Sequence, residues 1–233
     1  MSKKRSKRYN EAAKLVDSTK AYAVDEAVAV MKSFPAPKFD PTVTVSFRLT
    51  VDPRKSDQMV RGSVSLPHGT GKNVRVIVFA QGEAAAAALE AGAEKVGLED
   101  LIKEIQGGYL DFDSAIATPD AMAQVRKIAR VLGPRGLMPN PKTGTVTDDT
   151  AKAVREVKAG RVDFKVDKNA NISAAVGKLS FDNEKLVENA RAFISAVVKA
   201  RPSGAKGAYI SGATMSSSMN PGLTLSQVEF SKL

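Results

Sequence analysis

The chain has 233 residues, 43% of them hydrophobic, and it carries a formal net charge of +10. This length allows one large domain or two ordinary ones, and the hydrophobic content excludes a disordered tail protein. No apolar run approaches the roughly 18 residues that a membrane span requires, and no apolar segment follows the basic start. We therefore expect neither a membrane span nor a secretory signal.

The rare residue types limit the possible chemistry. The chain has no cysteine, no tryptophan and one histidine, His68. Disulfides, thiolate nucleophiles and cysteine metal sites are thereby excluded, and a histidine-based metal or acid–base site has no second histidine. The low aromatic content argues against a base-stacking platform, and the lack of cysteine fits a reducing cytoplasm. We expect no catalytic residue, no metal and no cofactor.

The excess positive charge lies in the two outer thirds of the chain. Residues 1–66 hold 13 Lys/Arg against 7 Asp/Glu, and residues 161–233 hold 10 against 6. The middle, residues 67–160, holds 12 of each. A basic excess of this size suggests a polyanionic partner. If the two ends form one domain, that domain is the expected anion binder.

In the outer thirds of the chain, some segments have apolar residues at helical spacing and others have them at every second position. Apolar residues at helical spacing predict helices at 7–16, at 24–32 and from the capping Asp182 to about residue 200. Alternating apolar residues predict strands at 42–50, 61–66, 161–167, 172–176, 208–215 and 223–230. The strands at 161–167 and 172–176 are expected to pair as a hairpin that turns at residues 168–171.

The middle third has a different pattern. A nearly unbroken apolar run at 74–80 predicts a buried parallel strand, with further short strands at 95–97 and 114–117. Helices are expected at 83–91, 99–106, 120–132 and 148–158, with Thr118 as the cap of the third. Strands that alternate with helices are typical of a layered α/β domain.

Two breaks in the pattern predict domain boundaries. Proline and glycine at 67–71 interrupt the chain before the middle third, and residues 159–160 mark the return. We therefore expect an α/β fold with two domains. A discontinuous α+β domain, the expected anion binder, is built from both chain ends, 1–67 plus 160–233, and a three-layer α/β domain, 68–159, is expected to be inserted into it.

The middle third also carries an unusual run at 129–146, which contains three glycines and three prolines. Their alternation defines one irregular path, because proline fixes φ and glycine permits positive φ. Arg135 and Lys142 lie on this path, and no acidic residue occurs between Asp120 and Asp148. By itself the run reads as a stiff surface connection.

The sequence Gly69-Thr-Gly-Lys72 suggests a phosphate-binding loop but departs from the motif. The phosphate-loop motif has a glycine five residues before its second glycine and Ser or Thr after its lysine. At these two positions the chain has Leu66 and Asn73. The run also precedes its strand instead of following one. An α/β enzyme that uses a nucleotide in the middle domain is kept as the alternative function. Acid pairs such as Asp148-Asp149 lie at predicted helix starts, where they stabilise the helix dipole.

Three segments of the outer thirds together look like a binding surface. The first places Lys38, Phe39 and Thr42 where a loop enters a strand. The second places Lys165, Asp167 and Lys168 at a predicted bend. The third, residues 215–222, is a hydroxyl-rich turn with two methionines that we expect to be exposed. Cations, hydroxyls and flat apolar groups are the mixture that suits folded RNA.

Several strings resemble one known family in the same order from about Tyr9 to Leu225. They are Asp52-Pro-Arg-Lys-Ser-Asp57, Leu66-Pro-His-Gly-Thr-Gly71, Leu132-Gly-Pro-Arg-Gly-Leu-Met-Pro-Asn-Pro-Lys142, Lys165-Val-Asp-Lys168 and Gly177-Lys-Leu-Ser-Phe181. The chain resembles the first-numbered large-subunit ribosomal proteins (L-one), bacterial form. The resemblance implies the two-domain fold above and binding to a helical-junction element of large-subunit rRNA. It further implies a place in the mobile side stalk beside the exit-site tRNA, whose release it helps, and repression of the protein's own mRNA.

The resemblance also implies a set of RNA-binding residues: Lys38, Phe39, Thr42, Lys165, Asp167, Lys168, Lys178, Ser180, Ser217, Ser218, Met219 and Asn220. The family usually has two threonines, methionine and glycine at 217–220. Asn220 therefore stands at a glycine position, and asparagine tolerates positive φ. The Gly-Pro-Arg-Gly run is interpreted as structural or as a secondary contact. The expected location is cytoplasmic, in the large ribosomal subunit, with no membrane and no small-molecule substrate.

Overall fold

The computed structural model describes residues 5–205 and 207–232, so the first four residues of the basic start lie outside the described residues. The side chains of residues 142, 229, 231 and 232 are also outside the description. The chain divides into two compact units. Unit 1 comprises Met1–Gly71 and Val162–Leu233, and unit 2 comprises Lys72–Arg161. Each unit is described by itself.

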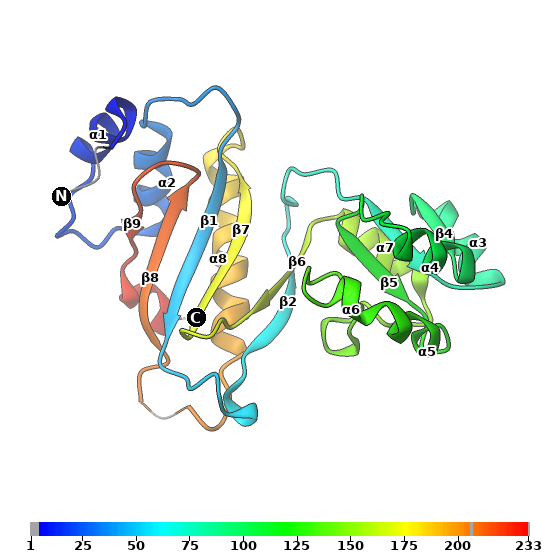
Figure 1. Ribbon diagram of the computed structural model, residues 1–233. Coiled ribbons are helices and arrows are strands. Elements are labelled where there is room, and N and C mark those ends of the chain that lie inside the picture. Colours follow the sequence, from blue (N-terminus) through cyan, green and yellow to red (C-terminus); the bar gives the residue numbers. More distant parts are fainter. Residues whose placement is uncertain (1–4, 206, 233) are drawn as a thin grey trace. The chain divides into compact units, whose positions relative to one another are not determined.

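Unit 1 combines α-helices with a four-stranded sheet and a two-stranded sheet (Figure 1). The helices are α1 (Lys7–Lys14), α2 (Val24–Lys32) and α8 (Asn183–Lys199), with short 3₁₀ turns at Ser56–Gln58 and Gln227–Lys232. The strands are β1 (Thr42–Leu49), β2 (Arg61–Ser65), β6 (Arg161–Lys165), β7 (Asn171–Lys178), β8 (Ile210–Ser217) and β9 (Leu223–Thr224). The larger sheet has the order β7-β1-β8-β9, and α2 and α8 lie against one of its faces.

The core of unit 1 follows from the alternation in β1. Val43, Val45, Phe47 and Leu49 are buried, and the residues between them face the other side of the sheet. Phe47 packs on Phe193 of α8, with ring centroids 5.7 Å apart. The buried side chains of α8 and β1 therefore fix which face of the sheet is left without a helix.

The hairpin predicted for residues 161–176 is wrong. β6 pairs with β2, whereas β7 pairs antiparallel with β1. The bend at residues 167–171 does form, with the Asp167 amide donating to the Asn171 carbonyl at 2.8 Å. The strands separate there because each buries its apolar residues against a partner from the other end of the chain. Turn residues set the bend, but long-range burial selects the partner strand.

Three other expectations in unit 1 need correction. The predicted strand at 223–230 ends at Thr224 and gives way to a 3₁₀ turn, since the chain there bridges to Tyr22 and then leaves the sheet. The helix predicted at 7–16 ends at Lys14. Met215, expected to be exposed, is fully buried, because it lies on the inward face of β8.

The predicted hinge at 67–71 is held against α8 within unit 1. Asn189 is fully buried, and its side-chain oxygen accepts from the His68 amide at 3.1 Å. Its side-chain nitrogen donates to the Gly69 carbonyl at 2.9 Å and to the Val176 carbonyl at 2.8 Å. Gly71 has a φ of 69°, and a Cβ there would lie 2.9 Å from the Phe181 ring. The segment is therefore part of unit 1, and the boundary falls after Gly71.

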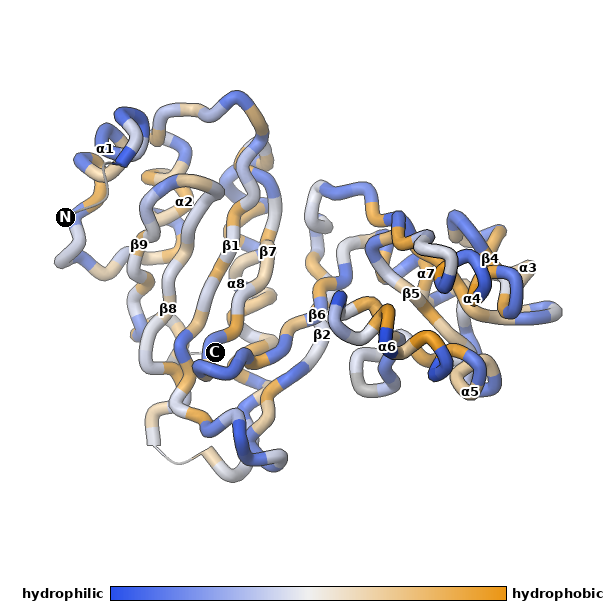
Figure 2. The backbone as a smooth tube through the Cα atoms, viewed as in Figure 1, coloured by the Kyte–Doolittle hydropathy of each residue, from blue (hydrophilic) through white to orange (hydrophobic). Residues whose placement is uncertain are grey.

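Unit 2 is a layered α/β structure. Its parallel sheet has the order β4-β3-β5, and Figure 2 marks apolar stretches in orange. The strands are β3 (Val76–Phe79), β4 (Lys95–Gly97) and β5 (Ser114–Ala117), and the helices are α3 (Glu83–Glu90), α4 (Glu99–Gln106), α5 (Met122–Val125), α6 (Ala129–Leu132) and α7 (Thr150–Lys158). Ile77 and Phe79 pack with α4, α5 and α6, whereas Val76 and Val78 pack with α3 and α7. Helices thus cover both faces of this sheet.

The single helix predicted at 120–132 is broken into three pieces. α5 and α6 flank a 3₁₀ turn at Arg126–Ile128, and Thr118 does not cap the first piece. The carbonyls of Thr118 and Pro119 instead share the Met122 amide. Before α7, Asp149 caps the helix start, since its carboxylate accepts from the Lys152 amide at 2.9 Å.

Candidate nucleic-acid interface

Nine of the predicted RNA-binding residues lie at the end of the sheet where β1 begins. Thr42 pairs with Lys178 of β7, and Val43 pairs with Ser217 of β8. We call this group the β1-start cluster: Lys38, Phe39, Thr42, Lys178, Ser180, Ser217, Ser218, Met219 and Asn220. Three segments that are far apart in sequence therefore meet because β1 is the central strand between β7 and β8.

Hydrogen bonds connect several polar residues of this cluster to one another, in part through Asp40. The Ser218 amide donates to the Thr42 carbonyl at 3.0 Å, and the Ser218 hydroxyl accepts from the Thr42 amide at 3.2 Å. Lys178 Nζ donates to Thr42 Oγ1 at 3.0 Å. Asp40 accepts from both the amide and the hydroxyl of Ser180, at 3.2 and 2.7 Å. Sequence reasoning missed Asp40, whose carboxylate fixes the position of Ser180.

The turn at residues 217–220 is held in an uncommon conformation. The Asn220 amide donates to the Ser217 carbonyl at 3.0 Å and closes the turn. Met219, at the third position, has a φ of 62°, where glycine or asparagine is usual. Asn220, which stands where the family usually has glycine, does not itself take a positive φ. Asn220 instead donates its side-chain amide to Ser217 Oγ at 2.8 Å.

The side chains of this turn differ in how far they reach solvent. Met219 is 71% exposed, although its backbone is in a conformation that is costly for methionine. Ser217 is only 3% exposed and its hydroxyl accepts from Asn220. Ser217 therefore shapes the turn, whereas Met219 projects from it.

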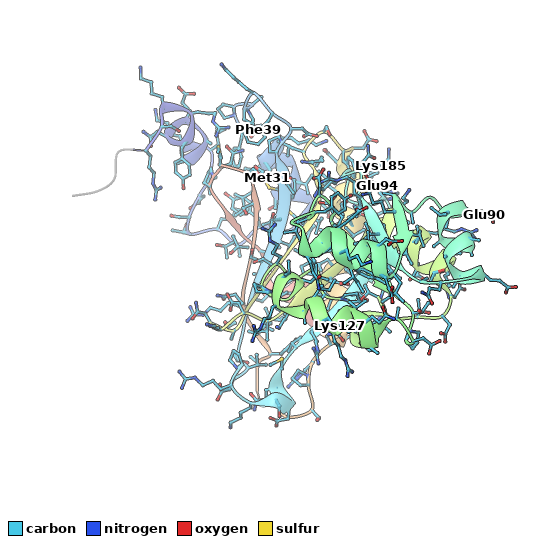
Figure 3. The ribbon with its side chains drawn as sticks, turned by 45° about the vertical axis from the view of Figure 1, so that its right-hand side comes forward. Met31, Phe39, Glu90, Glu94, Lys127 and Lys185 are labelled. Carbon is cyan, nitrogen blue, oxygen red and sulfur yellow. The ribbon has the colours of Figure 1, made fainter. Side chains whose placement is uncertain are left out.

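Phe39 adds a second exposed apolar group to the same end of the sheet. It is 47% exposed on the loop before β1 and is labelled in Figure 3. A groove of about 410 Å³ lies beside it, lined in part by Pro37, Pro41 and Leu179. Lys32 also lines this groove and donates to the Phe181 carbonyl at 2.5 Å. The groove is mostly apolar, and its charged or hydroxyl-bearing lining residues are Lys32, Asp40 and Ser180.

The remaining three predicted residues form a separate group, the β7-start cluster: Lys165, Asp167 and Lys168. Arg48, near the end of β1, pairs with Asn171, the first residue of β7. Because Asp167 bonds to Asn171, this cluster lies at the opposite end of β1 from Thr42. β1 spans Thr42–Leu49, which at about 3.3 Å per residue separates its ends by roughly 23 Å. The structure does not join the twelve predicted residues into one cluster.

Asp167 has a structural role at its bend. Its Oδ1 accepts from the amides of Asn169 and Asn171, both at 2.8 Å. The hydrogen bond from the Asn171 backbone, followed by that from Asn169, lowers the pKa of the Asp167 carboxyl. The carboxylate is thus ionised at neutral pH and holds the bend, while Lys165 and Lys168 are exposed on either side of it.

The outward face of the sheet between the two clusters carries further polar groups that sequence reasoning missed. Ser46 Oγ and Ser173 Oγ are 2.9 Å apart on neighbouring strands. The pairings place other outward residues of the three strands beside them: Thr44, Arg48, Thr214 and Ser216. The alternation of apolar residues at 42–50 could have revealed this face of the sheet. The buried apolar residues of β1 leave its other residues, Thr42, Thr44, Ser46 and Arg48, on the opposite face. This row of hydroxyls continues the β1-start cluster along the sheet, and it ends at Arg48, which pairs with Asn171.

Unit 2 has a cavity of another character. It has a volume of about 330 Å³ at the carboxyl ends of the strands, the usual ligand position in α/β sheets. Gln81, Thr118 and Gln124 line it together with the carboxylates of Asp120 and Asp148. Two carboxylates disfavour a phosphate group. Within the described residues, no group of three or more acidic, histidine or cysteine side chains is placed to hold a metal.

The described helices also include none with the length and apolar character needed to cross a bilayer. The fold is a mixed α/β fold, and its sheet face gathers hydroxyl and ammonium groups of the kind that contact nucleic acids. These features are typical of a nucleic-acid-binding protein with a mixed α/β fold. Comparison with known sequences identifies the family.

The family model described as "Ribosomal protein L1p/L10e family" matches residues 31–221. The chain is 60% identical to the large ribosomal subunit protein uL1 of Saccharopolyspora erythraea, over 94% of this chain and 92% of that protein. It is 56% identical to the protein of the same name from Bifidobacterium longum, over 94% and 96% of the two chains. It is 60% identical to that of Nocardia farcinica, over 94% and 93%.

The chain belongs to the ribosomal protein L1p/L10e family, in its bacterial form. The resemblance inferred from the sequence strings is therefore confirmed. Members of this family are structural ribosomal proteins, so the alternative of a nucleotide-using enzyme is set aside.

Proposed function

We propose that the chain is a structural constituent of the large ribosomal subunit, and that it binds large-subunit rRNA through the outward face of the unit 1 sheet. The observation that carries the proposal is Met219, an exposed apolar side chain on a strained turn among hydroxyls and lysines. Backbone strain persists where surrounding structure enforces it, and it concentrates at functional sites. A protein of the large subunit acts in the cytoplasm.

The β1-start cluster supplies the contacts that folded RNA requires. Lys38 and Lys178 can pair with phosphates, and Thr42 and Ser218 lie where hydroxyls meet 2′-hydroxyls of the ribose. Lys178 donates to Thr42 Oγ1 and, at 3.5 Å, to the Asp40 carbonyl, which leaves one of its three donors for a phosphate oxygen. Met219 and Phe39 offer flat apolar surface to a ribose or an unstacked base. This mixture favours recognition of RNA shape over reading of a base sequence.

The proposal is tested by filter binding with two RNAs. One is the side-stalk junction of large-subunit rRNA, transcribed in vitro, and the other is a duplex of equal length. Tight binding to the junction with much weaker binding to the duplex supports the proposal. Equal affinity for both RNAs contradicts it.

The β7-start cluster adds two exposed lysines near the other end of β1. We propose that this end of the sheet gives the chain a second point of contact with RNA, which suits a protein of the mobile stalk that meets the exit-site tRNA and helps its release. Crosslinking from Lys165 and Lys168 in ribosomes that carry a deacylated tRNA tests this. Crosslinks to rRNA alone, with none to tRNA, contradict the tRNA contact.

We also propose that the chain represses its own mRNA by binding a fold that mimics the rRNA junction. Translation in vitro of a reporter behind the natural leader should fall as the protein is added. Added rRNA junction should restore it, because both RNAs compete for the β1-start cluster. Repression that rRNA does not relieve contradicts a shared site.

A further inference from the structure

Helix α1 meets the RNA-facing turn through one side chain. Arg8 Nη2 donates to the carbonyl of Met219 at 3.3 Å, across a sequence separation of 211 residues. α1 is mostly hydrophilic in Figure 2, but Ala12 is fully buried in the unit 1 core and anchors it. The Ser6 hydroxyl accepts from the Tyr9 amide at 3.2 Å and caps the helix start. Arg8 therefore approaches the turn from a fixed helix.

Other groups of the turn are bonded either to β1 or within the turn. Ser218 bonds to Thr42, and both the amide and the side chain of Asn220 bond to Ser217. Among the described residues, the group that bonds the Met219 carbonyl is the Arg8 guanidinium. The residue with the least favourable backbone conformation in the turn is thus the one that Arg8 restrains.

The Arg8 guanidinium is partly enclosed by the protein. Its Nη1 is buried and has no hydrogen-bond partner among the described residues, and the same holds for Asn220 Oδ1. Its Nη2 donates to the Met219 carbonyl, and the residue as a whole is half-buried. With Nη1 buried and Nη2 bonded to the turn, Arg8 has fewer donors left for a phosphate than an exposed lysine has.

We propose that Arg8 is a positioning residue for RNA recognition: it holds the Met219 carbonyl, and so keeps the Met219 side chain projecting from the sheet. This inference rests on the proposed function of the β1-start cluster. The N-terminal helix, which contains none of the RNA-binding residues expected from the sequence, then acts on affinity through Met219.

The test is a double-mutant cycle of Arg8→Ala and Met219→Ala, read by filter binding to the side-stalk junction RNA. Lys7→Ala is the matched control, since Lys7 is an exposed cation on the same helix. We expect Arg8→Ala to weaken binding about tenfold and to add little in the Met219→Ala background, as coupled neighbours do. Lys7→Ala should change affinity less than about threefold, and Arg8→Ala should leave the slope of log K against log salt unchanged.

A second measurement needs no RNA. The amide exchange of Asn220 should quicken in the Arg8→Ala protein while circular dichroism remains that of the parent, because the turn loosens without unfolding. Unchanged affinity for Arg8→Ala, a full loss that persists in the Met219→Ala background, or a salt slope lower by about one unit overturns the inference. If the Met219→Ala protein binds the RNA normally, the proposed RNA site itself is wrong. The outcomes above contradict only the role of Arg8, so the two hypotheses are tested separately.

Discussion

Ser218 and Thr42 hold each other through a reciprocal pair of hydrogen bonds. The amide of Ser218 donates to the carbonyl of Thr42, and the hydroxyl of Ser218 accepts from the amide of Thr42, at 3.0 and 3.2 Å. The pair joins the residue that follows β8 to the first residue of β1. A residue near the C-terminal end of the chain thereby sets the position of a residue near its start.

We expect Ser218→Ala to lower the free energy of unfolding by about 0.5–1.5 kcal/mol, because the Thr42 amide loses its acceptor. Affinity for the junction RNA should fall as well. Ser218→Thr keeps the hydroxyl and should preserve both properties. Urea unfolding and filter binding measure them. A Ser218→Thr protein as impaired as Ser218→Ala would show that the hydroxyl is not the important group.

Met219→Ala should weaken RNA binding by about 1–3 kcal/mol, because it removes an apolar contact at the centre of the proposed interface. Stability should stay within about 0.5 kcal/mol of the parent, since the side chain is largely exposed. Leu89→Ala is the matched control: it removes an exposed apolar side chain from unit 2. Equal losses of affinity in the two proteins would argue against the β1-start cluster as the site.

The RNA affinity should fall steeply with salt. If about five phosphates are neutralised by the lysines and arginines of unit 1, log K should fall against log salt with a slope of about −4. A titration of the complex with potassium chloride measures this slope. A flat response would mean that phosphate contacts contribute little.

Asn189→Ala should lower the free energy of unfolding by about 1–3 kcal/mol, because the His68 amide and two carbonyls lose their partner in a buried position. Amide exchange at His68 should also quicken, since the segment at 67–71 is released from α8. Glu188→Ala is the comparison. Glu188 bonds the His68 ring at 2.5 Å, but from an exposed position, and its loss should cost less. A larger loss for Glu188→Ala would contradict this assignment.

Residues 1–71 joined by a short Gly/Ser linker to residues 162–233 should fold and bind the junction RNA. β2 pairs with β6, and the Val166 amide donates to the Val60 carbonyl at 2.9 Å, so the outgoing and returning chains run side by side. Residues 72–161 should fold alone, because their sheet has its own apolar clusters. They should bind the RNA poorly. Joined ends that fold but do not bind, together with a middle fragment that does bind, would reverse the assignment.

The local pattern of the sequence was enough to place many elements. The helices at Val24–Lys32 and Glu99–Gln106 have the predicted bounds, as do the strands at Lys95–Gly97 and Ser114–Ala117. The alternation in β1 also predicted which of its side chains are buried. These features depend on neighbours three or four residues away, or two in a strand, and such spacing is visible in any single sequence.

Only the tertiary structure decided which strands pair and which distant residues meet. Periodicity does not state that β7 pairs with β1 instead of β6, since that choice depends on burial between segments distant in the chain. The same choice separates Lys168 from Thr42 by the length of a strand, and it brings Ser218 to Thr42. The positive φ at Met219, one residue before the position at which the family usually has glycine, was not visible in the sequence either. The same holds for the hydrogen bond from Arg8 to the Met219 carbonyl, which joins residues 211 positions apart.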